Sequence, residues 1–360
     1  MDRSITEHIM KNNGTYKLLI FALAFAAIIC TMVSCKQDVI FYDIAQEIEY
    51  EAPIVEGNIL SMVPCNGQLF VQNNNIYKKG WLDEKTSDAR WRQLSVAPVS
   101  GKPVAMLASD ENYLYALVKD NAAATKGDVY AAPVTSSGMG DWSRVGQNVL
   151  ALFDNRVFNR SNGNTAGRNA YFTDENKAVK KLAGTGTAVD QSVTDVLGDT
   201  SEDAYIRTAG SDGTNDYFCS NSIFAVLNVS GTAYLYTFDK ALSSSAGGKT
   251  MKYKVATASS FSDGGTTESI ITTLTADGSD KLLVGTQGGY EVSTVGSDGK
   301  PGNGASPSNN AESAFGTRYV TGIWHYGADG TLYAAVVGVE HSTYNKLWGF
   351  YTLRNKWNYE

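Results

Sequence analysis

The segment that decides the fold reads Val104-Ala-Met-Leu-Ala-Ser-Asp-Glu-Asn-Tyr-Leu-Tyr-Ala-Leu-Val118. Two apolar runs flank a short polar turn, and two further runs, Asp128-Val-Tyr-Ala131 and Trp142-Ser-Arg-Val145, follow after polar connections. Short apolar runs that are rich in aromatic and β-branched residues and are separated by turn residues predict β-strands. This segment therefore predicts four short strands in succession.

The same order of runs recurs along the chain. The last copy consists of Thr321-Gly-Ile-Trp324, Thr331-Leu-Tyr-Ala-Ala-Val336, Lys346-Leu-Trp-Gly-Phe350 and Trp357-Asn-Tyr359. The first copy consists of Ile59–Val63, Leu69–Val71, Asn75–Tyr77 and Trp91–Leu94, and fainter copies lie in 149–182, 222–255 and 269–292. The second strands are predicted to begin at residues 69, 114, 170, 223, 282 and 332, a spacing of 45 to 59 residues.

A period of about 50 residues with four strands in each copy indicates a β-propeller. The second strands are almost wholly apolar, as expected for strands that neighbouring blades cover on both faces. We therefore expect an all-β chain with a single β-propeller, with six blades favoured and seven as the alternative. Trp91, Trp142 and Trp357 are expected at equivalent places on outer strands, packed between sheets. A pair of packed β-sandwich domains would explain the density of strands but not the recurring tryptophan.

An apolar segment precedes the repeats. Leu18–Val33 contains no charged residue, and it runs into Met32-Val-Ser-Cys35, with small residues directly before the cysteine. It is shorter than the ~20 residues that a membrane-spanning helix needs, which argues against an uncleaved transmembrane segment. The segment is typical of a secretory signal. It resembles the lipobox of bacterial lipoproteins, and this resemblance implies cleavage before Cys35 and a lipid on its thiol.

Together with the repeat, the resemblance implies an organisation of the chain: a signal peptide at 1–34, a lipidated N-terminus with a first strand or tether at 35–57, and the propeller at 58–360. Asp2 and Glu7 do not suit the positive start of a signal peptide, so Met10 is favoured as the true start. A looser resemblance to propeller lipoproteins covers most of the remaining chain. It implies an exported protein, held by its lipid at the outer membrane or cell surface of a bacterium.

The ends of the remaining chain are expected to meet. Residues 39–50 read as extended strand, and we expect them to lie next to residues 346–359 and so close the ring. The alternative is that 36–57 is a flexible tether.

Charge argues against one class of partner. The chain has 30 Lys and Arg against 37 Asp and Glu, a net charge of −7, and it contains no basic cluster. Nucleic acid is therefore not an expected partner. Cys65 and Cys219 fall on repeat units that would lie far apart, whereas a disulfide needs Cα atoms within about 7 Å. Both thiols are expected to be unpaired and mostly buried.

No motif indicates a cofactor or a metal. His325 and His341 lack the Cys/His spacing of a zinc site, and Asp277-Gly278 predicts a hairpin turn. Aromatic residues on connections are the best indication of binding, because Tyr and Trp are common anchors of recognition. We name no catalytic or metal residue, and the candidate binding residues are Trp81, Trp324, His325 and Tyr344.

These features favour a membrane-anchored binding or scaffold module for a protein or glycan partner at the cell envelope. The alternative is an envelope carbohydrate-active enzyme, a hydrolase or lyase, with loop carboxylates in the central funnel. A fold alone does not separate the two. Two or three converging carboxylates with a Tyr or His would favour the enzyme, whereas a flat, aromatic or mixed rim would favour binding.

Overall fold

The computed structural model describes residues 55–80, 91–136, 138–159, 165–239, 248–278, 280–307, 318–326, 331–337, 345–351 and 356–360. The chain divides into two units, Met1–Ala52 and Pro53–Glu360, and every described residue belongs to the second. The described part of this unit contains β-strands and no helix.

The strands form sheets that follow the order of the chain. A four-stranded sheet holds β1 (Met62–Cys65), β2 (Gln68–Asn73), β3 (Asn75–Gly80) and β4 (Arg92–Gln93). An eight-stranded sheet holds β5 (Val104–Ser109), β6 (Tyr113–Lys119), β7 (Gly127–Thr135), β8 (Gly138–Met139), β9 (Ser143–Asp154), β10 (Ala170–Asp174), β11 (Val179–Lys181) and β12 (Val189–Gln191).

Three sheets come from the second half of the chain. The two-stranded sheet holds β13 (Thr208–Ser211) and β14 (Asp216–Cys219). The next, four-stranded, holds β15 (Ala225–Val229), β16 (Thr232–Phe238), β17 (Thr250–Val255) and β18 (Ser262–Thr266). A seven-stranded sheet holds β19 (Ile271–Asp277), β20 (Lys281–Thr286), β21 (Gly289–Thr294), β22 (Tyr319–His325), β23 (Leu332–Val337), β24 (Lys346–Tyr351) and β25 (Lys356–Tyr359).

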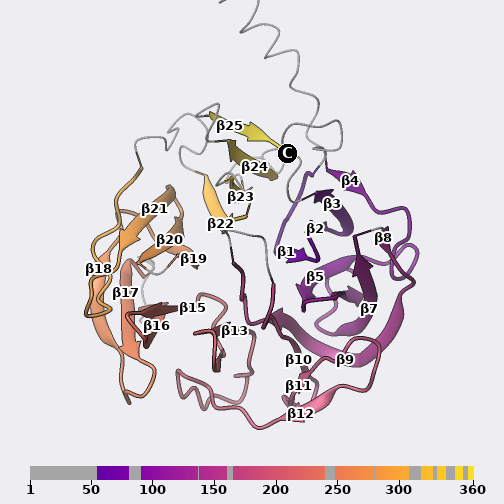
Figure 1. Ribbon diagram of the computed structural model, residues 1–360, viewed down its shortest axis with the longest axis horizontal. Coiled ribbons are helices and arrows are strands. Elements are labelled where there is room, and N and C mark those ends of the chain that lie inside the picture. Colours follow the sequence, from indigo (N-terminus) through magenta and orange to yellow (C-terminus); the bar gives the residue numbers. More distant parts are fainter. Residues whose placement is uncertain are drawn as a thin grey trace, which may run out of the picture. The chain divides into compact units, whose positions relative to one another are not determined.

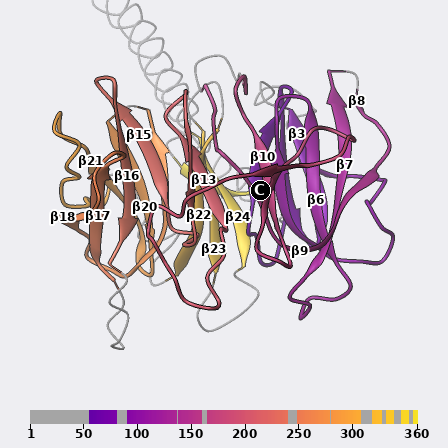
Figure 2. The ribbon, with the colours of Figure 1, turned by 90° about the horizontal axis from the view of Figure 1, so that it is seen from below.

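These sheets follow one another around a ring, so that β22–β25 come to lie next to β1–β4 (Figure 1). Seen from the side, the strands run next to each other between the two faces of the ring (Figure 2). Within the described residues, seven strands supply the wall of one central cavity: β1, β5, β9, β13, β15, β19 and β22. The unit is an all-β propeller, as the sequence repeat predicts.

The grouping of strands differs from the six units that the sequence favoured. β13 and β14 pair only with each other among the named strands of the described region, and at four residues each they are too short to give a clear apolar run. The apolar run after Ser222 was expected to be a second strand, but it is β15, which pairs as a first strand with β16. Seven groups therefore surround the centre in the described part of the chain.

β9 belongs to two of these groups. Its first half pairs with β7, from Ala131↔Ser143 to Gly127↔Val149. Its second half pairs with β10, from Asp174↔Val149 to Ala170↔Asp154. The outer strand of one group therefore continues directly as the inner strand of the next.

The ring closes where the two ends of the unit meet. Three backbone hydrogen bonds make the junction: Gly57 N to Asn345 O (2.6 Å), Leu347 N to Val55 O (3.2 Å) and Val55 N to Glu360 O (3.0 Å). The buried Lys79 ammonium and the Trp91 indole N–H also donate to the Glu360 carboxylate, at 2.9 and 2.6 Å. Residues 39–50, which were expected to make this closure, lie outside the described residues.

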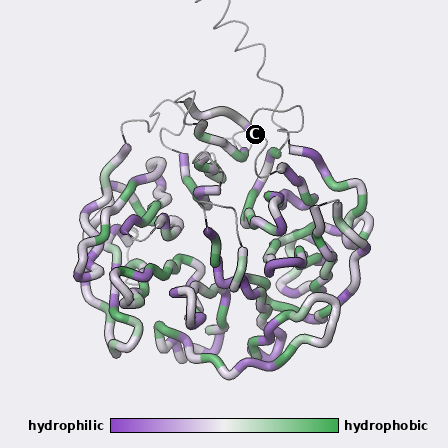
Figure 3. The backbone as a smooth tube through the Cα atoms, viewed as in Figure 1, coloured by the Kyte–Doolittle hydropathy of each residue, from purple (hydrophilic) through white to green (hydrophobic). Residues whose placement is uncertain are grey.

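The core is divided among the interfaces between neighbouring sheets, and hydrophobic stretches occur in every sheet (Figure 3). Trp91 packs with Tyr333 of the last group, and Trp357 packs with Tyr290 of β21, so each lies between its own group and the preceding one. Trp142 packs against a cluster that combines residues of the first sheet with residues of β5–β7. The predicted packing between sheets is therefore found, but the places differ: Trp91 and Trp142 each precede an outer strand, whereas Trp357 lies within one. Trp91 and Trp357 are buried, but Trp142 is only partly buried. Cys65 and Cys219 are buried and free of disulfides, as expected.

Candidate functional site

The candidate site is the cavity at the centre of the ring, which has a volume of about 280 Å³. Its wall is built from inner strands, where alternate side chains point to the centre, and from the residues that follow them. Asp154, Asp277 and His325 occupy the same place in three groups, because each is the last residue of an inner strand. The repeat therefore carries polar side chains from distant parts of the sequence to one cavity.

Asp154 and Arg168 form a buried ion pair in the wall of this site. Arg168 Nη2 donates to Asp154 Oδ1 at 2.8 Å, and both side chains are almost completely buried. The carboxylate also accepts from the backbone N–H groups of Ser109 (3.1 Å) and Arg156 (3.0 Å). Burial lowers the pKa of Arg168, but Asp154 and the hydroxyl of Tyr326 together raise it above its ordinary value. This ion pair fixes two opposite charges in the wall of the cavity.

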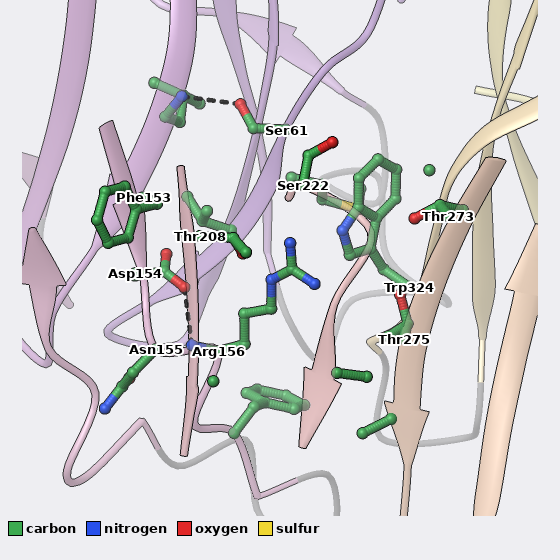
Figure 4. A pocket seen from close by; sticks show the side chains of 18 of the residues that line it. Ser61, Phe153, Asp154, Asn155, Arg156, Thr208, Ser222, Thr273, Thr275 and Trp324 are labelled. Atoms are coloured by element: carbon green, nitrogen blue, oxygen red, sulfur yellow. Dashed lines mark hydrogen bonds between the residues drawn. The ribbon is translucent and has the colours of Figure 1, made fainter. Parts of the chain in front are cut away.

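Arg156 supplies a second cation, and this one reaches into the cavity (Figure 4). Its backbone has a φ of +58°, a conformation that side chains rarely adopt, and the Asp154 carboxylate holds the turn through the Arg156 N–H. Nη1 donates to the carbonyl oxygens of Phe224 (3.0 Å) and Leu274 (3.5 Å). Protein atoms surround the guanidinium, so burial lowers its pKa, while Asp154 opposes that shift. Water inside the cavity still reaches the side chain.

Hydroxyl groups and one indole complete the wall around Arg156. Figure 4 shows Thr208, Ser222, Thr273 and Trp324 around the guanidinium. Thr208 is buried, and its hydroxyl has no hydrogen-bond partner within the described residues. The Trp324 ring lies over Gly322, where a Cβ would come within 2.2 Å of the indole. Glycine at 322 thus makes room for the ring beside the cavity.

A second polar pair lies in the same wall. His325 Nδ1 and Asp277 Oδ1 are 2.9 Å apart, and the two side chains are 14% and 12% exposed. They stand at the ends of neighbouring inner strands, β22 and β19. An imidazole oriented by a carboxylate can accept or donate a proton, so this pair is the part of the cavity with the chemistry of a general acid or base.

The charge of the cavity contrasts with that of the chain. Its wall contains three arginines, Arg156, Arg168 and Arg207, against two carboxylates, Asp154 and Asp277. The whole chain carries a net charge of −7. An acidic protein with a cationic cavity favours an anion at that place, because opposite charge is attracted most strongly where water is partly excluded.

The structure places two of the residues that the sequence analysis proposed for binding: Trp324 and His325 both line the cavity. Trp81, Tyr344 and Cys35 lie outside the described residues. Sequence reasoning missed Arg156 and gave Asp277 only a turn role. The available signal was the repeat itself, because the ends of equivalent first strands should meet at the centre of the ring.

Within the described ranges, no cluster of three or more His, Cys, Asp or Glu residues could hold a metal ion. No helix in that part of the chain is long and apolar enough to cross a membrane.

Comparison with known proteins adds little beyond the fold. No protein-family model and no curated protein matches the chain. A chain of a nidogen–laminin complex aligns at 12% identity and a TM-score of 0.42, over 81% of this chain and 90% of that one. YCF48 from Cyanidioschyzon merolae aligns at 11% identity and 0.39, over 85% and 86%. The WD40 domain of Neurospora crassa Pan2 aligns at 10% identity and 0.47, over 77% and 86%. At these values the likenesses carry no information about a ligand or an activity.

Proposed function

We propose that this protein is an exported binding protein of a bacterial envelope, anchored by a lipid on Cys35, whose propeller binds a protein or glycan partner. The observation that carries the proposal of binding is the Arg156 guanidinium, which extends into a polar central cavity. Donors that line a concave site bind a ligand specifically, because they gain more from a matching acceptor there than at an open surface.

The anchor is proposed from the sequence alone. The apolar run before Cys35 and the small residues that precede it support cleavage and lipidation at that cysteine. The Cys35→Ala variant should leave the membrane fraction or accumulate as an uncleaved precursor. Processing and membrane partition equal to those of the wild type would refute the anchor.

Binding is tested with the purified full-length protein in detergent, immobilised and exposed to envelope polysaccharides and envelope proteins. The wild type and the Arg156→Met variant are compared, because methionine keeps part of the apolar stem but removes the cation. A partner retained by the wild type and lost by the variant supports binding at the cavity. Equal retention by both proteins would refute it.

The His325–Asp277 pair favours a second candidate, an envelope carbohydrate-active enzyme. Two carboxylates and a histidine line the cavity, which is the arrangement expected of such an enzyme, although Asp154 is already engaged by Arg168. Release of new reducing ends from an envelope polysaccharide, lost in His325→Ala, would support the enzyme. Binding of a polysaccharide without cleavage would refute it.

A further inference from the structure

The Arg156 guanidinium has donors that the described residues do not use. Only Nη1 has acceptors there, the carbonyl oxygens of Phe224 and Leu274, so the N–H groups of Nη2 and Nε remain available. Asp154, the carboxylate nearest in sequence, already binds Arg168 and accepts two backbone N–H groups. The charge of Arg156 is therefore matched by dipoles rather than by an ion pair of its own.

A free guanidinium edge is suited to a carboxylate, because its parallel N–H groups fit the two oxygens in a bidentate arrangement. The surrounding cavity limits what else the ligand can be. At about 280 Å³ it is near the lower end of ligand pockets, roughly 300–1,000 Å³. The occupant is therefore a small molecule or the end of a larger one.

The remaining wall favours a sugar over a peptide end. Trp324 contributes an indole to the wall, and an indole packs well against the apolar side of a flat ring. The hydroxyls of Thr208, Ser222 and Thr273 also line the cavity. Thr208 is only 2% exposed, and its hydroxyl has no partner within the described residues, so a ligand hydroxyl would supply a hydrogen bond that it lacks.

We propose that the central cavity binds a sugar acid, such as a uronic acid unit, with its carboxylate on Nη2 and Nε of Arg156 and its ring against Trp324. This inference rests on the proposed binding function and specifies the chemical class of its ligand. The unpaired Thr208 hydroxyl bonds a sugar hydroxyl in this arrangement. The ligand enters as one acidic unit, either free or at the end of a glycan.

The test is titration calorimetry of the full-length protein in detergent with four probes: glucuronate, galacturonate, glucose and acetyl-aspartate. Binding of at least one uronate, with no measurable binding of glucose, is the expected result. Arg156→Met should weaken that binding roughly tenfold or more, since a charge-assisted pair is lost. Binding should also weaken as salt increases.

Two variants keep the proposal falsifiable if Arg156→Met unfolds. Thr208→Val keeps the shape of the side chain and removes a hydroxyl without a partner, so we expect a stable protein that binds the uronate several-fold more weakly. Lys102→Met, at an exposed ion pair with Asp120, is the matched control and should bind as the wild type does.

Three results would overturn the proposal. These are no uronate binding, equal binding of glucose and glucuronate, or tighter binding of acetyl-aspartate than of either uronate. Failure here is distinct from failure of the proposed function. If no uronate binds but the wild type retains an envelope partner that Arg156→Met loses, the binding function stands and only the sugar acid is excluded as its ligand.

Discussion

Replacing Asp154 by asparagine should destabilise the propeller more than any exposed charge change. The substitution removes the negative charge 2.8 Å from Arg168 Nη2, in a place where the two side chains are only 5% and 1% exposed. Removing one partner of a buried pair leaves an uncompensated charge, at a cost of about 3–5 kcal/mol. For a unit of this size that corresponds to a fall in Tm of roughly 6–10 °C.

The assay is thermal and urea unfolding of wild type and variants, followed by circular dichroism. Asp120→Asn is the matched control, because Asp120 forms an ion pair with Lys102 at the surface, where the side chains are 80% and 45% exposed. That change should leave the free energy of unfolding almost unchanged, because water screens an exposed pair. The double variant Asp154→Asn with Arg168→Met should recover much of the loss, since the unpaired cation is gone.

A fall in Tm no larger for Asp154→Asn than for Asp120→Asn would refute this reasoning. It would mean that water or other groups compensate the Arg168 charge. The ion pair with Asp154 would then not be what fixes these charges in the cavity wall. A double variant that is less stable than either single change would refute the charge argument in a different way, by showing that packing and hydrogen bonds dominate.

Three further predictions follow from other buried groups. Trp91→Ala should lower the free energy of unfolding by about 3–5 kcal/mol, because Trp91 fills the interface at the closure of the ring. Trp142→Ala should lower it clearly less, because Trp142 is only partly buried. Equal losses for the two variants in urea unfolding would contradict this. Burial raises the pKa of Glu291 in the folded protein above its ordinary value of 4.5, which it keeps when unfolded. The protonated side chain therefore contributes its full stability below pH 4.5, and this contribution is lost as the pH rises through the folded-state pKa. Glu291→Gln should therefore flatten the decline of stability with rising pH, and an unchanged pH profile of the Tm would count against it. Burial raises the pKa of the Cys65 thiol to about 12, so iodoacetamide at pH 8 should modify Cys65 only after unfolding, as checked by mass spectrometry of native and urea-treated protein.

The repeat in the sequence predicts the class of fold because each second strand is covered on both faces and is therefore apolar. Leu114–Val118 in β6 and Leu282–Val284 in β20 are examples, and both stretches are buried. β13 and β14 escaped prediction for the opposite reason. They are only four residues long, and β13 contains Gly210 between polar and small residues.

One local signal of the hairpins was also overlooked. Asp110 accepts from the backbone N–H groups of Asn112 and Tyr113 and from the Tyr115 hydroxyl, and Asp212 repeats the pattern with Thr214, Asn215 and Tyr217. An aspartate followed five residues later by a tyrosine therefore marks the turn between first and second strands here. Recognising it at Asp212 would have revealed the group that contains β14.

The candidate site was harder to predict because it depends on the arrangement of the groups around the ring. Nothing in the neighbourhood of Arg156 along the chain indicates that it lines one cavity with Thr208 and Trp324. That arrangement follows from closing the ring, which brings distant parts of the chain to one wall. Trp324 and His325 were named for their aromatic and titratable side chains, whereas the partner of His325, Asp277, had been assigned only to a turn.

The shared strand β9 has a consequence for how the molecule opens. Two neighbouring groups share one continuous backbone from Ser143 to Asp154, and their two registers meet at Val149, so opening of one group is coupled to the other through this strand. Amide protons along both halves of this strand should exchange with solvent at similar slow rates, as one cooperative segment. The two-stranded β13–β14 sheet should exchange sooner. Arg156 follows directly on the end of β9, so its position in the cavity depends on the part of the ring that opens last.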